Sequence, residues 1–352
     1  MPALGAATDP AAVADAKLTA TIPTGKGLPV VVHAALAFIE VEAFDENKGV
    51  FDATTDLRLA WRDPRLHFPA SDAIRGYREW RASAAEQELR SIWTPRMRFP
   101  NRAGEPSFTE RRLRVYPDGR VEVIARTAAT YKTTVDVTRF PFDHQNLRVQ
   151  VAVEEDTIET VDLAFSREDV EFSRAPQGSE PSGWTMGLVH LKRETQKGWN
   201  GDRYARIDFS LDVARNAGST VPAIFIPLFA SLLIPFLAVW MNRAEGGDFE
   251  VEAFELANVV IGGLFAVIAL SFTVSSAFPV VAASDNTVTR LIALNYVALA
   301  MGIMITVVFY RFRLPARWFG PAVQHHLFRA ITWAFPVTFV VIGLAILAAA
   351  AA

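Results

Sequence analysis

The chain has 352 residues, of which 51% are hydrophobic and 21% are charged, and its formal net charge is −3. This length exceeds one ordinary compact domain and predicts about two. The slightly negative charge argues against a nucleic-acid partner held by phosphate contacts, and the lack of cysteine excludes disulfide scaffolds, thiolate metal sites and cysteine nucleophiles. The mean hydropathy of +0.20 is high for a soluble protein, so the position of the apolar residues matters most.

The first two thirds of the chain carry a strand pattern. Apolar and polar residues alternate in short segments, which predicts strands. The segments are 31–36, 55–61, 113–116, 121–124, 147–151 and 205–211. The sequence Pro117-Asp118-Gly119 predicts a hairpin turn, and a short helix is expected at 70–81, which 82–89 would extend. Many short strands with regular turns predict an immunoglobulin-like β-sandwich over 28–217, preceded by an N-terminal extension at 1–27.

Four long apolar stretches follow, at 221–241, 256–278, 291–310 and 327–352. Each has roughly the 20 residues that a helix needs to cross a bilayer, and a membrane bundle tolerates their internal prolines. We therefore expect a transmembrane four-helix domain at 218–352, with helices at 219–241, 255–278, 288–311 and 327–350. The alternative is a set of buried helices in a large soluble protein, but four such stretches in one block are hard to bury.

The charges between these stretches predict the orientation. The connection between the third and fourth stretches contains Arg311, Arg313, Arg317 and Arg329, whereas the preceding one contains Asp285 and Arg290. The positive-inside rule places the arginine-rich connection in the cytoplasm and the N-terminal domain outside. Residues 1–20 have neither a basic n-region nor an apolar h-region, so we expect a mature chain whose export signal has been removed.

Residues 133–147 read TTVDVTRFPFDHQNL, with the core Phe140-Pro141-Phe142-Asp143. This segment resembles the loop that names the Cys-loop receptors, the pentameric ligand-gated ion channels. Thr133 and Leu147 stand where animal members have two cysteines. Prokaryotic members typically lack that disulfide, in agreement with a chain that contains no cysteine.

Further motifs of this family occur in the right order. Residues 61–66 resemble the family's W-x-D-x-R-L strand end, and residues 92–95 resemble its loop A. Trp184 and Arg215 match a tryptophan before the late strands and an arginine just before the first membrane helix. The resemblance extends from about residue 28 to 352; it departs where Arg96 replaces the usual acid of loop A, and before residue 28.

The resemblance points to the prokaryotic branch, and within it to amine-gated bacterial members. It implies an α+β multidomain protein: an extracellular β-sandwich followed by the transmembrane bundle, assembled as a homopentamer, a ring of five. It also implies a multi-pass protein of a bacterial inner membrane that passes monovalent cations, is not an enzyme and needs no cofactor.

In this family ligands bind between subunits. The resemblance places on one side Trp93, Glu154, Glu155, Asp156, Trp199 and Tyr204, and on the facing side Asp56, Arg58 and Arg114. Aromatic rings with carboxylates suit a small protonated amine through cation–π contact and ion pairing. Protons acting on these acids or on His144 and His190, or a divalent cation at residues 154–156, stay open as stimuli, as does a merely solvated loop.

The second membrane helix lines the pore in this family. Counting back from Pro279, the pore positions are Glu255, Asn258, Gly262, Phe265, Ala269, Phe272 and Ser276. Their spacing of three and four residues puts them on one helical face. The opposite face, expected to pack on other helices, contains Val259, Val260, Leu264, Val267 and Ile268. The alternative is an ordinary lipid-facing helix.

Two pore roles follow from these positions. Five copies of Glu255 at the cytoplasmic mouth form a carboxylate ring that favours cations. Phe265 and Phe272, about two turns apart, form an apolar constriction that closes the pore by dewetting. Alternatively, the phenylalanines pack between subunits.

The resemblance also places the coupling between the two domains. It involves Glu46 between the first strands, the loop containing Asp143, and the connection that begins near Pro279. We expect Asp143 and Arg215 to form a partly buried ion pair, whose loss on one side is costly. The alternative is that Asp143 only fixes its own turn.

Two other functions compete with a channel. The first is a non-conducting, membrane-anchored sensor. Such a sensor would need neither an acid at one end of the second helix nor an apolar constriction in its middle. A membrane enzyme or transporter lacks support, because no metal spacing, nucleophile–base motif or phosphate loop is present, and the third and fourth helices contain no acid.

Overall fold

The computed structural model describes residues 20–25, 27–178, 181–245, 248–250 and 253–351. Most of the expected N-terminal extension, including the residues discussed for an export signal, lies outside them. The chain divides into two compact units, Met1–Val135 with Gln145–Ala214, and Asp136–His144 with Arg215–Ala352. The segment Asp136–His144, which lies within the range expected for the sandwich, thus belongs with the helices.

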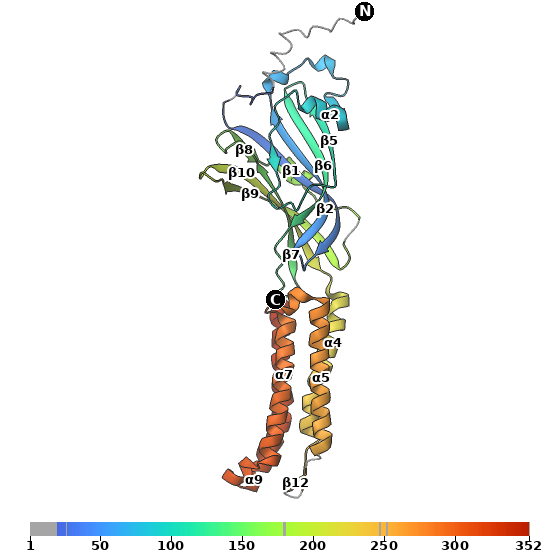
Figure 1. The fold of residues 1–352 in the computed structure, drawn as a ribbon, viewed down its shortest axis with the longest axis vertical. Helices are drawn as coiled ribbons and strands as arrows, with labels where there is room; N and C mark the ends of the chain where they lie inside the picture. The colour runs from blue at the N-terminus through green and yellow to red at the C-terminus, as the bar shows by residue number, and fades with distance from the viewer. Residues whose placement is uncertain (1–19, 26, 179–180, 246–247, 251–252, 352) are drawn as a thin grey trace, which may run out of the picture. The chain divides into compact units, whose positions relative to one another are not determined.

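The first unit contains two sheets (Figure 1). The larger has the order β3-β5-β6-β2-β1-β8 and is antiparallel except for the parallel pair β1–β8. Its strands are β1 (Val30–Asp45), β2 (Val50–Arg62), β3 (Arg78–Arg81), β5 (Phe108–Val115), β6 (Arg120–Lys132) and β8 (Val161–Ala164). The smaller sheet has the order β4-β7-β10-β9, with β4 (Met97–Arg98), β7 (His144–Val153), β10 (Arg203–Arg215) and β9 (Trp184–Lys197).

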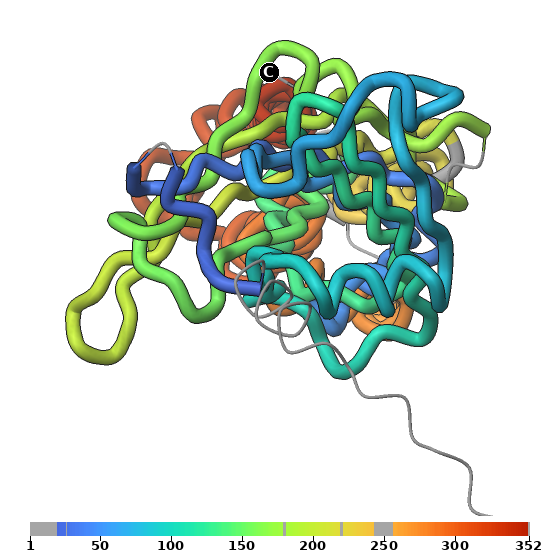
Figure 2. Tube along the Cα trace, turned by 90° about the horizontal axis from the view of Figure 1, so that it is seen from above, coloured from blue at the N-terminus to red at the C-terminus, as the bar shows by residue number. Residues whose placement is uncertain are grey.

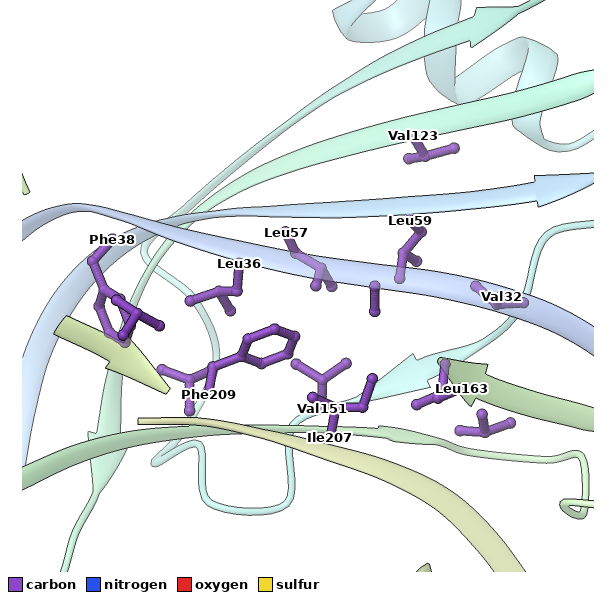
Figure 3. Close-up of a cluster of buried hydrophobic side chains, with 14 of the residues drawn as sticks. Val32, Leu36, Phe38, Leu57, Leu59, Val123, Val151, Leu163, Ile207 and Phe209 are labelled. Carbon is purple, nitrogen blue, oxygen red and sulfur yellow. The ribbon is translucent and has the colours of Figure 1, made fainter. Parts of the chain in front are cut away.

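The core lies between these sheets, because alternate residues of each strand point inward. Leu36, Phe38 and Leu57 from the larger sheet face Ile207 and Phe209 from the smaller one (Figure 3). All of them are buried. This packing confirms the predicted β-sandwich.

The helix expected at 70–81 is wrong. Residues Ala70–Asp72 form a single 3₁₀ turn and Arg78–Arg81 form strand β3, whereas only the proposed extension is helical, as α2 (Ala82–Leu89). Trp80 lies opposite Leu113 of β5, so the pairing of two distant segments outweighs the local pattern. Gly76 between them adopts φ +75°, which a continuous helix does not allow.

The predicted hairpin turn is confirmed between β5 and β6. Gly119 adopts φ +79°, and a Cβ there would lie 2.5 Å from the carbonyl oxygen of Asp63. Buried Asp63 in turn caps the turn at Pro64–Leu66 and pairs with Arg65 at 2.7 Å. The W-x-D-x-R-L motif therefore joins the end of β2 to this hairpin.

The second unit contains α4 (Ala217–Trp240), α5 (Ala253–Ala277), α6 (Pro279–Ala282), α7 (Thr287–Thr306), α8 (Leu314–Phe319) and α9 (Pro321–Ala351). A π-helical turn (Val307–Arg311) continues α7, and a hairpin of β11 (Arg243–Glu245) and β12 (Asp248–Glu250) joins α4 to α5. Among the described residues, four helices are long and apolar enough to span a membrane: Val221–Trp240, Leu256–Ala277, Thr287–Arg311 and Pro321–Ala350. The last begins several residues before the expected 327.

Buried polar side chains connect these helices. Ser231 of α4 donates to the Asn295 side chain of α7 at 2.8 Å, and Asn295 donates to the carbonyl of Leu228 at 3.4 Å. Further along, Asn242 donates to the Thr306 hydroxyl at 3.4 Å. Such hydrogen bonds between helices hold a membrane bundle together where the hydrophobic effect does not.

Candidate functional site

The predicted pore stripe of α5 lies on an exposed face of the subunit. Phe265 and Phe272 are 69% and 74% exposed. Every other stripe residue with a described side chain is exposed as well: Asn258, Gly262, Ala269 and Ser276. Glu255 lies in α5, but its side chain is outside the described ones.

The opposite side of α5 packs on its own subunit. Gly263, Val267 and Val274 are buried, and their spacing of four and seven residues puts them on the side facing away from the stripe. A Cβ on Gly263 would lie 2.8 Å from both Ile234 of α4 and Leu299 of α7. At the neighbouring Gly262 a Cβ would meet nothing within 4 Å.

The predicted packing face is therefore only partly right. Val267 is buried, whereas Leu264 and Ile268 are exposed. The seam is centred on the row of Gly263 because that residue lets α4 and α7 approach the backbone of α5. The sequence predicted that the bulky apolar residues form the packing face of α5. Instead, the side that faces α4 and α7 is the one that contains Gly263, which has no side chain.

The expected ion pair between Asp143 and Arg215 is present in the second unit. Arg215 Nε and Nη2 donate to the two carboxylate oxygens at 2.7 and 3.0 Å. The side chains are only 6% and 1% exposed, a deeper burial than expected. The Arg215 backbone N–H also donates to the Asp143 carbonyl at 3.1 Å, so Asp143 does more than fix its own turn.

The same segment contacts the connection after α5. The Phe140 ring lies beneath the Arg215 guanidinium at 4.8 Å and packs on Phe278 with 5.3 Å between ring centroids. Pro279 follows directly as the first residue of α6. Glu46, the remaining predicted coupling residue, lies in the turn between β1 and β2 of the first unit.

The predicted ligand residues of one side belong to three segments: loop A with Trp93 and Arg96, the acidic segment 154–156, and the β9–β10 hairpin with Trp199 and Tyr204. These three segments meet in the first unit. Arg96 Nη1 donates to Glu155 at 2.8 Å, and the Glu154 N–H donates to the Arg96 carbonyl at 2.9 Å. The N–H of Ile158 donates to the carbonyl of Arg203 at 2.8 Å, which ties the acidic segment to the start of β10. Arg96, which replaces the usual acid of loop A, thus pairs with Glu155 of the acidic segment.

The aromatic residues of this region differ in exposure. Trp199 is fully exposed in the β9–β10 hairpin, which extends away from the rest of the sandwich (Figure 2). Tyr204 is half-buried and packs on the backbone of Gly198, where a Cβ would lie 2.5 Å from the ring. Trp93 is only 7% exposed and packs edge-on against Trp61, so its ring belongs to the core.

The acidic segment itself is graded in burial. Glu154 and Glu155 are exposed and Asp156 is half-buried. Burial, and secondarily the neighbouring charge of Glu155, raises the pKa of Asp156 above its ordinary value. Among the described residues no three His, Asp or Glu side chains gather as a metal-ion site, so residues 154–156 gain no support as a divalent-cation site.

On the facing side, two of the three predicted residues, Asp56 and Arg114, are already paired within the large sheet, and Arg58 pairs with Asp169 of the helix α3 (Arg167–Phe172). Asp56 accepts two hydrogen bonds from Arg126, both at 2.8 Å. Arg114 donates to Glu79 at 2.9 Å. Asp56 and Arg114 therefore already form ion pairs with residues of neighbouring strands, and a ligand would have to compete with those partners.

A family model described as the neurotransmitter-gated ion-channel ligand binding domain matches residues 19–217. The chain belongs to the pentameric ligand-gated ion channel family. It is therefore a multi-pass membrane protein with four spans and an extracellular N-terminal domain, in a family of ion channels and not of enzymes. A proton-gated ion channel of Gloeobacter violaceus is 24% identical over 255 residues, which cover 71% of this chain and 65% of that protein. The match thus spans slightly less than two thirds of the relative.

The sequence did not predict one cluster of charged and aromatic side chains in the β-sandwich. Arg58 donates to Asp169 at 2.8 Å, His33 Nδ1 lies 3.1 Å from the same carboxylate, and the Arg58 guanidinium lies over the Phe172 ring. Burial alone would raise the pKa of Asp169, but hydrogen bonds from Ser166, Arg58 and His33 outweigh it and lower that pKa. The sequence did contain a signal, because Ser166 and Asp169 form the capping box of α3 (Arg167–Phe172).

Proposed function

We propose that the protein is a ligand-gated, cation-selective ion channel, a homopentamer in a bacterial inner membrane whose five α5 helices line the pore. The observation that carries this proposal is the orientation of α5. Its stripe, with polar ends and an apolar middle, faces away from the subunit, and the opposite row packs on α4 and α7. Within the described residues, 17% of this apolar span is buried, against 50% for α4 and 22% for α9. The low value leaves the surface of α5 open to neighbouring copies or to lipid.

Selectivity for monovalent cations is assigned to Glu255. It occupies the first turn of α5, where the helix dipole stabilises a carboxylate. Five copies around an axis concentrate cations at the cytoplasmic mouth.

The gate is assigned to Phe265 and Phe272. Both rings are exposed on the stripe and have no charged neighbour along it. An apolar ring of this kind excludes water and ions without a charged plug.

The agonist is proposed to be a small protonated amine bound at the meeting point of the three loops. Tyr204 and Trp199 supply aromatic surface, and Glu154 forms no ion pair with the described residues. A desolvated ammonium gains from ring faces and from carboxylates together. Trp93 is left out of this site because of its burial, and Asp56 and Arg114 contribute only if the agonist competes with Arg126 and Glu79.

Protons are the second candidate stimulus. The relative in Gloeobacter violaceus is named a proton-gated ion channel, and Asp156 has a raised pKa at the same loops. A carboxylate with a raised pKa is protonated earlier as the pH falls, so Asp156 is the residue assigned to proton sensing.

Currents across liposomes that contain the purified protein test these proposals. Primary amines applied at constant pH should open the channel, whereas pH steps without amine should do so under the second candidate. Asp156→Asn should remove a response to protons. Reversal potentials in a salt gradient should show cation preference in the wild type and a reduced preference in Glu255→Ala. Pentamers that conduct under neither stimulus would favour a non-conducting sensor.

A further inference from the structure

A hollow on the outer face of the small sheet contains basic side chains that the channel proposal does not use. Its volume of about 250 Å³ is close to that of the smallest pockets in which proteins hold small molecules. Leu147 and Val149 of β7 point into the core, so Arg148 between them points away from it. The lining comes from the segment after β4, from the end of β6 with the residues that follow it, and from β7: Asn101, Lys132, Thr133, Thr134, Arg148 and Gln150.

Asn101 fixes the shape of this hollow. Its Nδ2 donates to the carbonyls of Lys132 and Arg148 at 2.8 and 2.6 Å, and its Oδ1 accepts from the Gln150 N–H at 3.0 Å. One side chain therefore joins the end of β6 to β7. The walls are thus in place before any ligand enters, which lowers the cost of binding.

The positive charge of the hollow is only partly balanced. Lys132 is exposed and forms no ion pair with any acid that the structure describes. Arg148 Nη1 lies 3.7 Å from Asp208 Oδ2, beyond hydrogen-bond distance. Arg206 lies closer to the same carboxylate, with 2.8 Å between Nε and Oδ1. Because Asp208 is shared in this way, Lys132 and Arg148 together leave an excess of positive charge.

The free donors of the hollow fit a phosphate group better than a carboxylate. The Gln150 amide already donates to Asp208 at 3.3 Å. Among the described residues, this leaves the Lys132 ammonium, the Arg148 guanidinium and the Thr134 hydroxyl without a hydrogen-bond partner. A phosphate group offers three strong acceptor oxygens and about two negative charges, whereas a carboxylate offers two oxygens and one charge. Arginine and lysine both bind phosphate readily.

We propose that this hollow binds the phosphate group of a small organic monoester. Lys132 and Arg148 pair with the phosphate, and Thr134 donates its hydroxyl to it. The aliphatic stems of the two basic side chains supply surface for the organic part. Lys132 and Arg148 flank the segment 133–147, so an occupant joins both ends of the segment that contains Asp143. The proposal does not depend on ion selectivity or on the identity of the agonist.

Isothermal titration calorimetry of the full-length protein in a phosphate-free maltoside detergent tests the proposal. The probe is glucose 6-phosphate near neutral pH, compared with glucose, inorganic phosphate and succinate. Glucose 6-phosphate should bind saturably, with one molecule per subunit, and more tightly than each of the other three. Lys132→Gln and Arg148→Gln should each raise its Kd at least about tenfold, because each removes a charge-assisted hydrogen bond. Thr134→Val should raise the Kd by a smaller factor, because it removes a neutral donor.

Lys192→Gln is the matched control. Lys192 is an exposed lysine of β9 in the same sheet, and its ammonium already pairs with Glu194 at 2.8 Å. This variant should leave the Kd unchanged, and unaltered melting temperatures show that each variant is folded. Equal Kd values for Lys132→Gln and Lys192→Gln, or no saturable binding by the wild type, overturn the proposal. Equal affinity for succinate would mean a general anion site, and equal affinity for inorganic phosphate a site for the free ion; either result overturns it too.

Discussion

Two regions of the membrane unit differ in where their side chains find contacts: one within the subunit, the other outside it. Asp143 and Arg215 pair with each other and are buried inside one subunit. Along the stripe of α5, Phe265 and Phe272 are largely exposed on their own subunit. A closed region contributes to the fold of the subunit, whereas an open one is completed only by other copies or by water. Substitutions in the two regions should therefore fail differently.

The largest effect is expected at the closed junction. Arg215→Ala leaves the Asp143 carboxylate buried without its partner, at a cost of about 3–5 kcal/mol. The variant should fail to assemble at normal levels or to respond at all, as measured by size-exclusion chromatography and by currents. The matched control is Arg290→Ala, because the Arg290–Asp285 pair has the same bidentate geometry but is exposed. Its loss should be nearly silent; normal currents in Arg215→Ala would refute the closed-junction model.

The two adjacent glycines of α5 sharpen the comparison. Gly263→Ala forces a methyl group to within 2.8 Å of Ile234 and Leu299 and should destabilise the unit by about 1–3 kcal/mol. Gly262→Ala places the same group in open space and should leave the melting temperature unchanged or raised, while altering conductance. Equal melting temperatures for both variants would show that α5 is turned differently from the described orientation.

The open stripe is tested by Phe265→Ala. The side chain is 69% exposed on its own subunit, so the variant should fold and assemble like the wild type. Removing an apolar ring from the proposed constriction should let water enter and produce current without agonist. Liposome currents before any stimulus measure this leak. A variant that stays closed at rest would count against the gate.

The smallest effect concerns acid stability. The pKa of Asp169 is lowered in the folded chain, so its ionised form stabilises the fold above about pH 4, and this contribution disappears as the pH falls through the lowered pKa. Melting temperatures should therefore fall less steeply below that pH in Asp169→Asn than in the wild type. Asp285→Asn is the exposed counterpart, since Arg290 lowers the pKa of Asp285 in open solvent. It should follow the wild-type curve, and identical curves for all three proteins would remove Asp169 from this role.

Features that depend on the local sequence could be predicted, whereas features that depend on distant neighbours could not. Strand alternation, the turn at Gly119, the four spans and the shared face of the α5 stripe were predictable because each depends on local periodicity or on a single residue's conformational range. The helix expected at 70–81 failed because β3 owes its conformation to β5, a partner more than 25 residues away. The packing of α5 was only half predictable, since periodicity identifies a face but not the helices that approach it.

The candidate ligand site shows the same limit at the level of side chains. The sequence indicated which loops carry aromatic and acidic residues, and these loops do meet through Arg96, Glu155 and Ile158. It did not reveal that Trp93 packs into the core or that Arg58 is paired with Asp169, because burial and pairing depend on strands far apart in the chain.

By itself, the sequence determined the order of the two domains, the family and the residue types along the second span, since these are properties of composition, spacing and motif. The tertiary structure decided which of those residues are enclosed and which stay open. The reason is physical: the cost of exposing or burying a side chain is set by neighbours that the linear order does not specify. Gly262 and Gly263 are adjacent and chemically identical, yet one lies in open space and the other between two helices.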